Sequence, residues 1–306
     1  METMVLLIVK ILLVMGFGFV VRKYGLLPDT VEQGLSRLLL SAILPLSILA
    51  SGDVTLTKAL AGNLRMAALA TAGYYIVAIL LFSRLSRLLP VHRDKKRMLV
   101  ILSVFANTGF LGFPLMDALF GAEGMLYAVI YNLGFQLAFF TWGIAGLSNE
   151  GKLQWKSLCK MPVTLASLAT MLLVLTPLRL PALLQDTASS IGGMTTPLSL
   201  LLIGSSFTRM RVRELLCDRW SYLVSALRLI VLPLILLAVL LACGVSGVAG
   251  AACVMITALP CAAINAIYAE QYQVEPVFAA RAVIQSTLLM LVTFPLLLLL
   301  VRMVML

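Results

Sequence analysis

The segment that decides the fold is NTGFLGFPLMD, residues 107–117, inside a long apolar run that begins near Met98. Two glycines, a proline and an Asn-Thr pair interrupt this run where a membrane helix would have its middle. Proline removes a backbone N–H and clashes with the preceding turn, and glycine adds local freedom. Such an interruption is tolerated in the membrane only where the loosened backbone faces protein or a water-filled cavity. The segment therefore predicts a broken membrane helix with polar backbone near its centre.

The composition places the chain among membrane proteins. Its 306 residues are 61% hydrophobic and 12% charged, whereas soluble domains are about half apolar and about a quarter charged. A span needs about 20 mostly apolar residues, and Lys10 makes the first run a span rather than a signal peptide. We predict an all-α polytopic membrane protein with ten transmembrane helices, over residues 4–21, 34–50, 65–83, 98–119, 124–147, 161–177, 186–207, 221–243, 247–269 and 278–301.

Lysine and arginine gather in the loops on one side of the predicted spans, for example in RDKKR, residues 93–97. By the positive-inside rule this side is cytoplasmic, so both termini lie outside a cell (plasma) membrane. This topology and contact with anionic membrane lipids account for the net charge of +10. No nucleic-acid partner is expected, because no soluble nucleic-acid module is present.

Residue types that carry metal, redox or hydrolytic chemistry are sparse. The five cysteines form no C-x-x-C pair, and the single histidine, His92, lies in a basic loop. No metal site or cofactor is predicted. The chain also lacks H-E-x-x-H, paired mid-membrane aspartates and a Ser/His couple, so we do not expect an enzyme.

The two halves of the chain look like copies of each other. The segment LPDTVEQGLSRLLLSAILPLSILASGD, from Leu27, resembles LPALLQDTASSIGGMTTPLSLLLIGSS, from Leu180, about half a chain later. We predict a first repeat over residues 1–153 (helices 1–5) and a second over 154–306 (helices 6–10). An odd number of spans in each copy reverses the second copy in the membrane, which is the inverted repeat common in secondary transporters.

The fourth span of the second copy is also interrupted, at TALPCAAINAIYAEQY, residues 257–272. One interruption alone is more often a structural kink, but two at corresponding positions, each with an amide side chain, favour a binding site. We expect broken helices 4 and 9 to cross. Pro114 and Pro260 suit the first turn of a new half-helix, whose N–H groups favour an anion. The predicted site residues at the crossing are Asn107, Thr108, Gly109, Gly112, Pro114, Pro260 and Asn265.

These segments carry a resemblance to a known family. NTGFLGFPLM followed by FGAEGMLYAVIYNLG resembles the auxin efflux carrier family, as do LPCAAINAIYAEQYQVEP and the paired LPLSI and TPLSLLLIG stretches. That family includes plant PIN carriers and bacterial permeases for malate, malonate and other organic acids, and it is related in fold to bile acid:sodium symporters. The chain lacks the long hydrophilic loop of some plant members, which favours the bacterial type.

The resemblance implies an architecture and a site. It implies a scaffold of helices 1, 2, 6 and 7, a transport domain of helices 3–5 and 8–10, and a homodimer formed through the scaffold. It implies a substrate site where the two broken helices cross. Asn107, Pro114 and Pro260 take the positions of the family's crossover residues.

Other polar residues within spans have two interpretations each. Asn132 and Gln136, four apart on one helix face, either line the cavity or hold helices together, and the same holds for Gln285. Arg228 is interpreted first as snorkelling to lipid phosphates and second as attracting an anion. Lys10 fits a wet part of helix 1.

No Asp or Glu lies at the predicted membrane centre. Ion coupling therefore has three open forms: H⁺ through a shallow carboxyl such as Asp117 or Glu270, a cation such as Na⁺ held by backbone and side-chain oxygens, or no coupling. The predicted function is a secondary active carrier of small organic anions, such as mono- or dicarboxylates, that works by alternating access. Asn107 and Asn265 would bond the carboxylate. A channel or a sensor on the same fold is the alternative.

Overall fold

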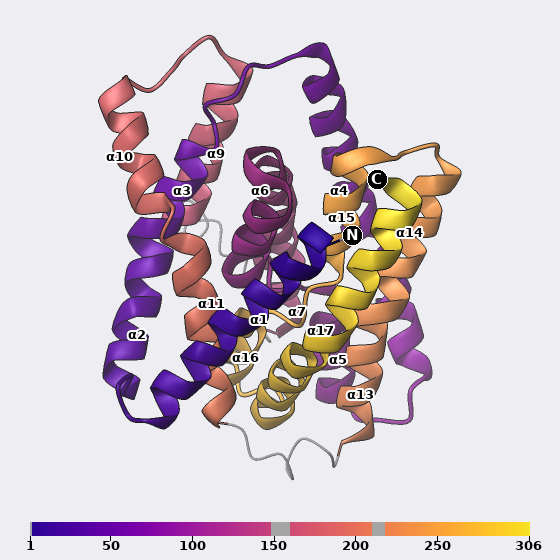
Figure 1. Cartoon of the computed structure of the whole chain (residues 1–306). Coiled ribbons are helices and arrows are strands. Elements are labelled where there is room, and N and C mark those ends of the chain that lie inside the picture. The colour runs from indigo at the N-terminus through magenta and orange to yellow at the C-terminus, as the bar shows by residue number, and fades with distance from the viewer. Residues whose placement is uncertain (1, 148–159, 210–217) are drawn as a thin grey trace.

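The computed structural model describes residues 2–147, 160–209 and 218–306, and the regular elements in these ranges are all helices (Figure 1). The first half of the chain contains α1 (Glu2–Lys23), α2 (Asp29–Leu38), η1 (Leu39–Ile43), α3 (Leu44–Ala50), α4 (Lys58–Leu85), η2 (Ser86–Leu88), α5 (Arg93–Val104), η3 (Thr108–Gly112), α6 (Phe113–Ala138), η4 (Phe139–Gly143) and α7 (Ile144–Leu147). The second half contains α9 (Pro162–Leu175), α10 (Ala182–Gly192), α11 (Thr195–Ser206), η5 (Phe207–Arg209), α13 (Arg219–Ala226), η6 (Leu227–Val231), α14 (Leu232–Ala242), α15 (Gly247–Thr257), α16 (Ala263–Gln271) and α17 (Pro276–Met305).

Several of these helices are long and apolar enough to cross a membrane. Within the described residues there are five such helical segments: Asp29–Ala50, Lys58–Leu88, Thr108–Leu147, Arg219–Ala242 and Pro276–Met305. Two shorter apolar helices, Pro162–Leu175 and Gly247–Thr257, accompany them. The chain is therefore a multi-pass, all-helical membrane protein, as predicted, while the full set of ten spans stays a prediction.

The segment Thr108–Leu147 is 40 residues long and is not one straight helix. Gly121 has φ 61° and ψ −148°, a conformation outside the helical region. The change of direction falls between the two predicted spans at 98–119 and 124–147. Glycine is the residue that adopts this region of backbone space without a steric penalty.

Three π-helical segments each end two residues before a proline. Segments η1, η3 and η6 precede Pro45, Pro114 and Pro233. Proline has no N–H and its ring clashes with the carbonyl four residues earlier, so a wider turn relieves the clash. Pro114 thus lies in the first turn of α6, as predicted, but a π-helical turn that begins at Thr108 precedes it. Pro260 lies in the non-helical segment before α16, so the prediction that Pro260 sits in the first turn of a new half-helix is wrong.

The helices pack in two groups around α6 (Figure 1). In one group α1 contacts α11, and α3 contacts α9 and α10. In the other, α17 contacts α13, α15 and α16, and α15 contacts α4 and α14. Helix α6 contacts members of both groups, so its buried residues bridge them.

Close backbone contact between α1 and α11 depends on two glycines. A Cβ atom added at Gly18 would lie 2.1 Å from the carbonyl oxygen of Leu201. One added at Gly204 would lie 1.8 Å from the carbonyl oxygen of Met15. Small residues let helix backbones approach each other in this way, which maximises van der Waals contact in a bilayer.

Candidate functional site

The site is built from two helix breaks that lie against each other. Helix α5 ends at Val104 and the helix restarts at Thr108. Helix α15 ends at Thr257 and α16 begins at Ala263. The chain in each gap includes extended backbone, so its amides and carbonyls need partners from outside their own helices.

The two gaps supply those partners to each other. Ala106 and Cys261 form an isolated antiparallel β-bridge, and the backbone N–H of Asn107 donates to the carbonyl oxygen of Pro260 over 2.9 Å. The breaks predicted at Asn107–Thr108 and at Pro260 therefore touch through their backbones.

Asn265 ties the second half-helix to the first break. Its fully buried side chain lies in the first turn of α16, and Nδ2 donates to the carbonyl oxygen of Phe105 over 3.1 Å. The same oxygen accepts a bond from the N–H of Ala262 over 3.1 Å. The Oδ1 atom of Asn265 has no hydrogen-bond partner among the described residues.

Asn107 acts as the N-cap of the helix that begins at Thr108. Its Oδ1 accepts a bond from the N–H of Phe110 over 3.2 Å, and the residue is half-buried. An N-cap oxygen satisfies one of the free N–H groups of the first turn.

A chain of hydrogen bonds leads from the first break to a neighbouring helix. Asn132 Nδ2 donates to Thr108 Oγ1 over 2.7 Å, and Gln136 Nε2 donates to Asn132 Oδ1 over 2.5 Å. The hydroxyl of Thr164, on α9, donates to Gln136 Oε1. Asn132 and Gln136 are buried, so they hold the break, α6 and α9 together in this conformation.

Gln285 lies beside the second break. Its neighbour Ser286 accepts a bond from the N–H of Cys261 over 3.1 Å. The buried amide of Gln285 has no partner among the described residues at either Nε2 or Oε1. An unpaired buried amide costs about 1–3 kcal/mol, so its presence here favours a ligand-binding role over a purely structural one.

Glycines at the first break allow close packing. A Cβ atom added at Gly112 would lie 3.2 Å from a side-chain carbon of Leu259 in the other break, and one at Gly109 would lie 3.9 Å from Nδ2 of Asn132. Gly112 therefore helps the two breaks to meet, whereas Gly109 tolerates a side chain sterically.

Arg228 is not a snorkelling residue. Its side chain is 0% exposed, so the sequence-based interpretation that it reaches lipid phosphates is wrong. Nε donates to the carbonyl oxygen of Leu259 over 3.0 Å, and Nη1 donates to those of Ser103 and Val104 over 3.1 and 2.9 Å. Arg228 thus contacts the backbones of both breaks. Lys10, by contrast, is exposed on α1.

Carboxylates lie away from the paired backbones. Asp117 accepts a bond from the hydroxyl of Thr196, on α11, over 3.1 Å. Glu32, the only acidic residue with a buried side chain in the described part of the chain, lies 3.5 Å from Arg22. Arg228 is therefore the one buried charge at the breaks among the described residues.

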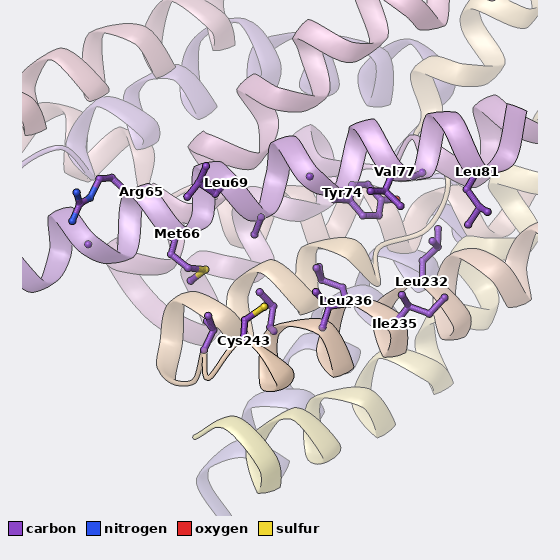
Figure 2. A pocket seen from close by; sticks show the side chains of 17 residues that line it. Arg65, Met66, Leu69, Tyr74, Val77, Leu81, Leu232, Ile235, Leu236 and Cys243 are labelled. Carbon is purple, nitrogen blue, oxygen red and sulfur yellow. The ribbon is translucent and has the colours of Figure 1, made fainter.

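A cavity of about 670 Å³ lies between α4 and α14 (Figure 2). Its walls are mostly apolar, with Arg65 towards one end and Tyr74 between the two helices. The hydroxyl of Tyr74 donates to the carbonyl oxygen of Val104 over 3.0 Å, so this wall residue also contacts the first break.

These features define a membrane transport protein built around two broken helices. A family model described as "Membrane transport protein" matches residues 3–154 and 147–298, which gives a two-repeat architecture. The chain belongs to this family, the auxin efflux carrier family that the sequence motifs resemble, and it is not an enzyme.

Two archaeal relatives carry transporter names. The chain is 27% identical over 201 residues to a protein of Methanothermobacter thermautotrophicus named "Uncharacterized transporter", covering 65% of this chain and 66% of the relative. It is 25% identical over 241 residues to "Uncharacterized transporter MJ1031" of Methanocaldococcus jannaschii, covering 75% and 76%. The similarity supports transport as the general function.

Proposed function

We propose that the chain is a secondary active carrier of small organic anions, such as mono- or dicarboxylates, with its substrate site at the crossing of the two breaks. The observation that carries the proposal is the pairing of Ala106 with Cys261. Because the pairing is antiparallel, the start of the helix at Thr108 lies beside the segment that follows α15, and the start of α16 lies beside the end of α5. Both helix N-termini therefore flank the paired backbones. Helix N-termini present free N–H groups and a partial positive charge, which together favour an anion.

The electrostatics of the crossing support an anionic substrate. In the described part of the chain the only buried charge there is the guanidinium of Arg228. Asn107 and Gln285 supply amide groups with hydrogen-bonding capacity left over. Amides and backbone N–H groups recognise carboxylates in general, so the proposal stops at the class of small organic acids.

We propose the mechanism of alternating access by two bodies. The scaffold would comprise helices 1, 2, 6 and 7 (α1, α2–α3, α9, α10–α11), and the transport domain the remaining helices. The separate packing of these two groups supports this division.

We further propose ten spans in two inverted repeats, a homodimer formed through the scaffold, and a plasma-membrane location with both termini outside.

The test is thermal stabilisation of the purified protein by a panel of small carboxylates. A ligand that binds only the folded state raises the stability by mass action. We expect a shift with at least one acid, its loss in Asn107→Ala, and its retention in Gln33→Ala, an exposed amide on α2. No shift in a folded protein contradicts the organic-anion function, and single-channel currents in a bilayer would favour a channel instead.

A further inference from the structure

Arg228 poses a problem of charge. It is fully buried in η6, the π-helical segment before Pro233. Burying a charge without a partner is strongly unfavourable, and in the described part of the chain no carboxylate forms an ion pair with it. Its compensation must come from dipoles.

Those dipoles are the C-terminal ends of two half-helices. Nη1 bonds the carbonyl oxygens of Ser103 and Val104 at the end of α5, and Nε bonds that of Leu259 just past the end of α15. Nη1 also donates to the hydroxyl of Tyr74, which in turn donates to Val104. One guanidinium therefore binds both broken helices at once.

The charge of the guanidinium matches the combined partial charge of the two helix ends. A helix C-terminus carries roughly half a negative elementary charge. The α5 and α15 ends together carry about one, which a single guanidinium balances. The N-terminal end at Thr108 is capped only by the neutral amide of Asn107, and no carboxylate forms an ion pair at either break among the described residues. The crossing therefore keeps a net positive field.

The end of α5 has donors on every carbonyl of its last turn. Ser103 and Val104 bond Arg228, the carbonyl of Leu102 accepts the thiol of Cys261 over 3.3 Å, and that of Phe105 accepts Asn265. In carriers with broken helices, such half-helix carbonyls are the usual ligands of a coupling cation such as Na⁺. Here protein donors already occupy them.

We propose that Arg228 is a built-in cation that takes the place of Na⁺ at the half-helix C-termini, so that anion binding at the crossing needs no inorganic cation. The inference rests on the proposed anion-carrier function and goes beyond it, because it decides among the open forms of ion coupling. Arg228 acts here as a positioning residue: it holds the two breaks together and sets the sign of their field.

The first experiment compares guanidinium with urea in Arg228→Ala. The two solutes share size and shape but differ in charge. We expect Arg228→Ala to bind the stabilising carboxylate about tenfold to a hundredfold more weakly. Guanidinium at low millimolar concentration should restore binding and thermal stability, and urea at the same concentration should not. Arg65→Ala, on the wall of the apolar cavity, is the control and should respond to neither solute.

Equal rescue by both solutes, or full carboxylate affinity in Arg228→Ala without rescue, overturns the proposal.

The second experiment needs no variant: carboxylate binding to the unmodified protein is measured with Na⁺ and with Na⁺ replaced by choline. We expect the same affinity in both media, and binding that requires Na⁺ overturns the proposal even where Arg228→Ala does not fold. If no carboxylate binds in either medium, the proposed function fails instead, and the rescue of thermal stability still tests Arg228.

Discussion

The backbone N–H of Asn107 donates to the carbonyl oxygen of Pro260 over 2.9 Å, although the two residues are half a chain apart. Half a chain is also the offset between the matching Leu-Pro and Pro-Leu-Ser segments of the two halves. The contact therefore joins equivalent positions of the two repeats. A pseudo-two-fold axis that relates the two repeats would produce this contact, because equivalent segments meet on such an axis.

Replacing Asn107 by aspartate separates the capping role of this residue from its binding role. Aspartate caps a helix about as well as asparagine, so Asn107→Asp should keep its thermal stability. Its negative charge at the crossing should repel a carboxylate and weaken binding about tenfold or more. Thermal unfolding and carboxylate titration of the same sample measure both effects. Unchanged affinity in Asn107→Asp would remove this side chain from the substrate site.

The sequence predicted the breaks because their signals are local. Glycine, proline and asparagine inside an apolar run at 107–114 and 257–265 conflict with a plain membrane helix, and the repeat showed that the two conflicts correspond. Two details were missed: the π-helical turn from Thr108 that precedes Pro114, and the position of Pro260 before α16 instead of in its first turn. Whether proline begins a helix or lies behind a π-helical turn depends on contacts that its neighbours in sequence do not specify.

The role of Arg228 was not predictable from the sequence. Its partners are backbone carbonyls of residues 103, 104 and 259, and a carbonyl carries no signature in the identity of its residue. The one available signal was an arginine in an apolar span without an acidic partner, which fits snorkelling equally well. Only the packing of η6 against both breaks shows that Arg228 bonds to these carbonyls and does not snorkel to lipid phosphates.

Thr164 on α9 tests the hydrogen-bond chain to the first break. Thr164→Val keeps the side-chain volume but removes the donor to Gln136. Leaving that buried amide oxygen unpaired should lower the stability by about 1–3 kcal/mol. Thr187→Val, which removes a hydroxyl bonded within its own exposed helix turn on α10, should cost less than about 0.5 kcal/mol. Similar melting temperatures for the two variants would show that this chain of hydrogen bonds contributes little to the stability of the protein.

Cys243 tests the orientation of the chain. It is exposed at the end of α14, whereas Cys253 and Cys261 are buried. If both termini face outward, Cys243 lies outside, and a membrane-impermeant maleimide should label it in intact cells. The test uses a background with Cys159→Ser and Cys217→Ser, since these positions lie outside the described residues. Cys243→Ser in this background is the control. Labelling only after permeabilisation would reverse the topology.

Gly18 tests the contact between α1 and α11. Gly18→Ala places a methyl group 2.1 Å from the carbonyl oxygen of Leu201, so the two helices must separate at a cost of about 1–3 kcal/mol. Gly16→Ala meets no atom within 4 Å in the same helix, and it should be neutral or stabilising by up to about 1 kcal/mol. Thermal unfolding of the pair measures the difference. Equal stability of Gly18→Ala and Gly16→Ala would contradict the close contact between α1 and α11.

Gly121 tests the turn between the fourth and fifth predicted spans. Its φ of 61° with ψ of −148° lies in a region that is essentially restricted to glycine, so Gly121→Ala should lower the stability by about 1–3 kcal/mol although no atom lies within 4 Å of the added methyl group. The loss would come from backbone strain alone. Gly34→Ala, in a helical and equally open position on α2, has no such strain and should not be destabilised. If both variants unfold at the same temperature, Thr108–Leu147 continues as a helix through residue 121, and the two spans are not separated there.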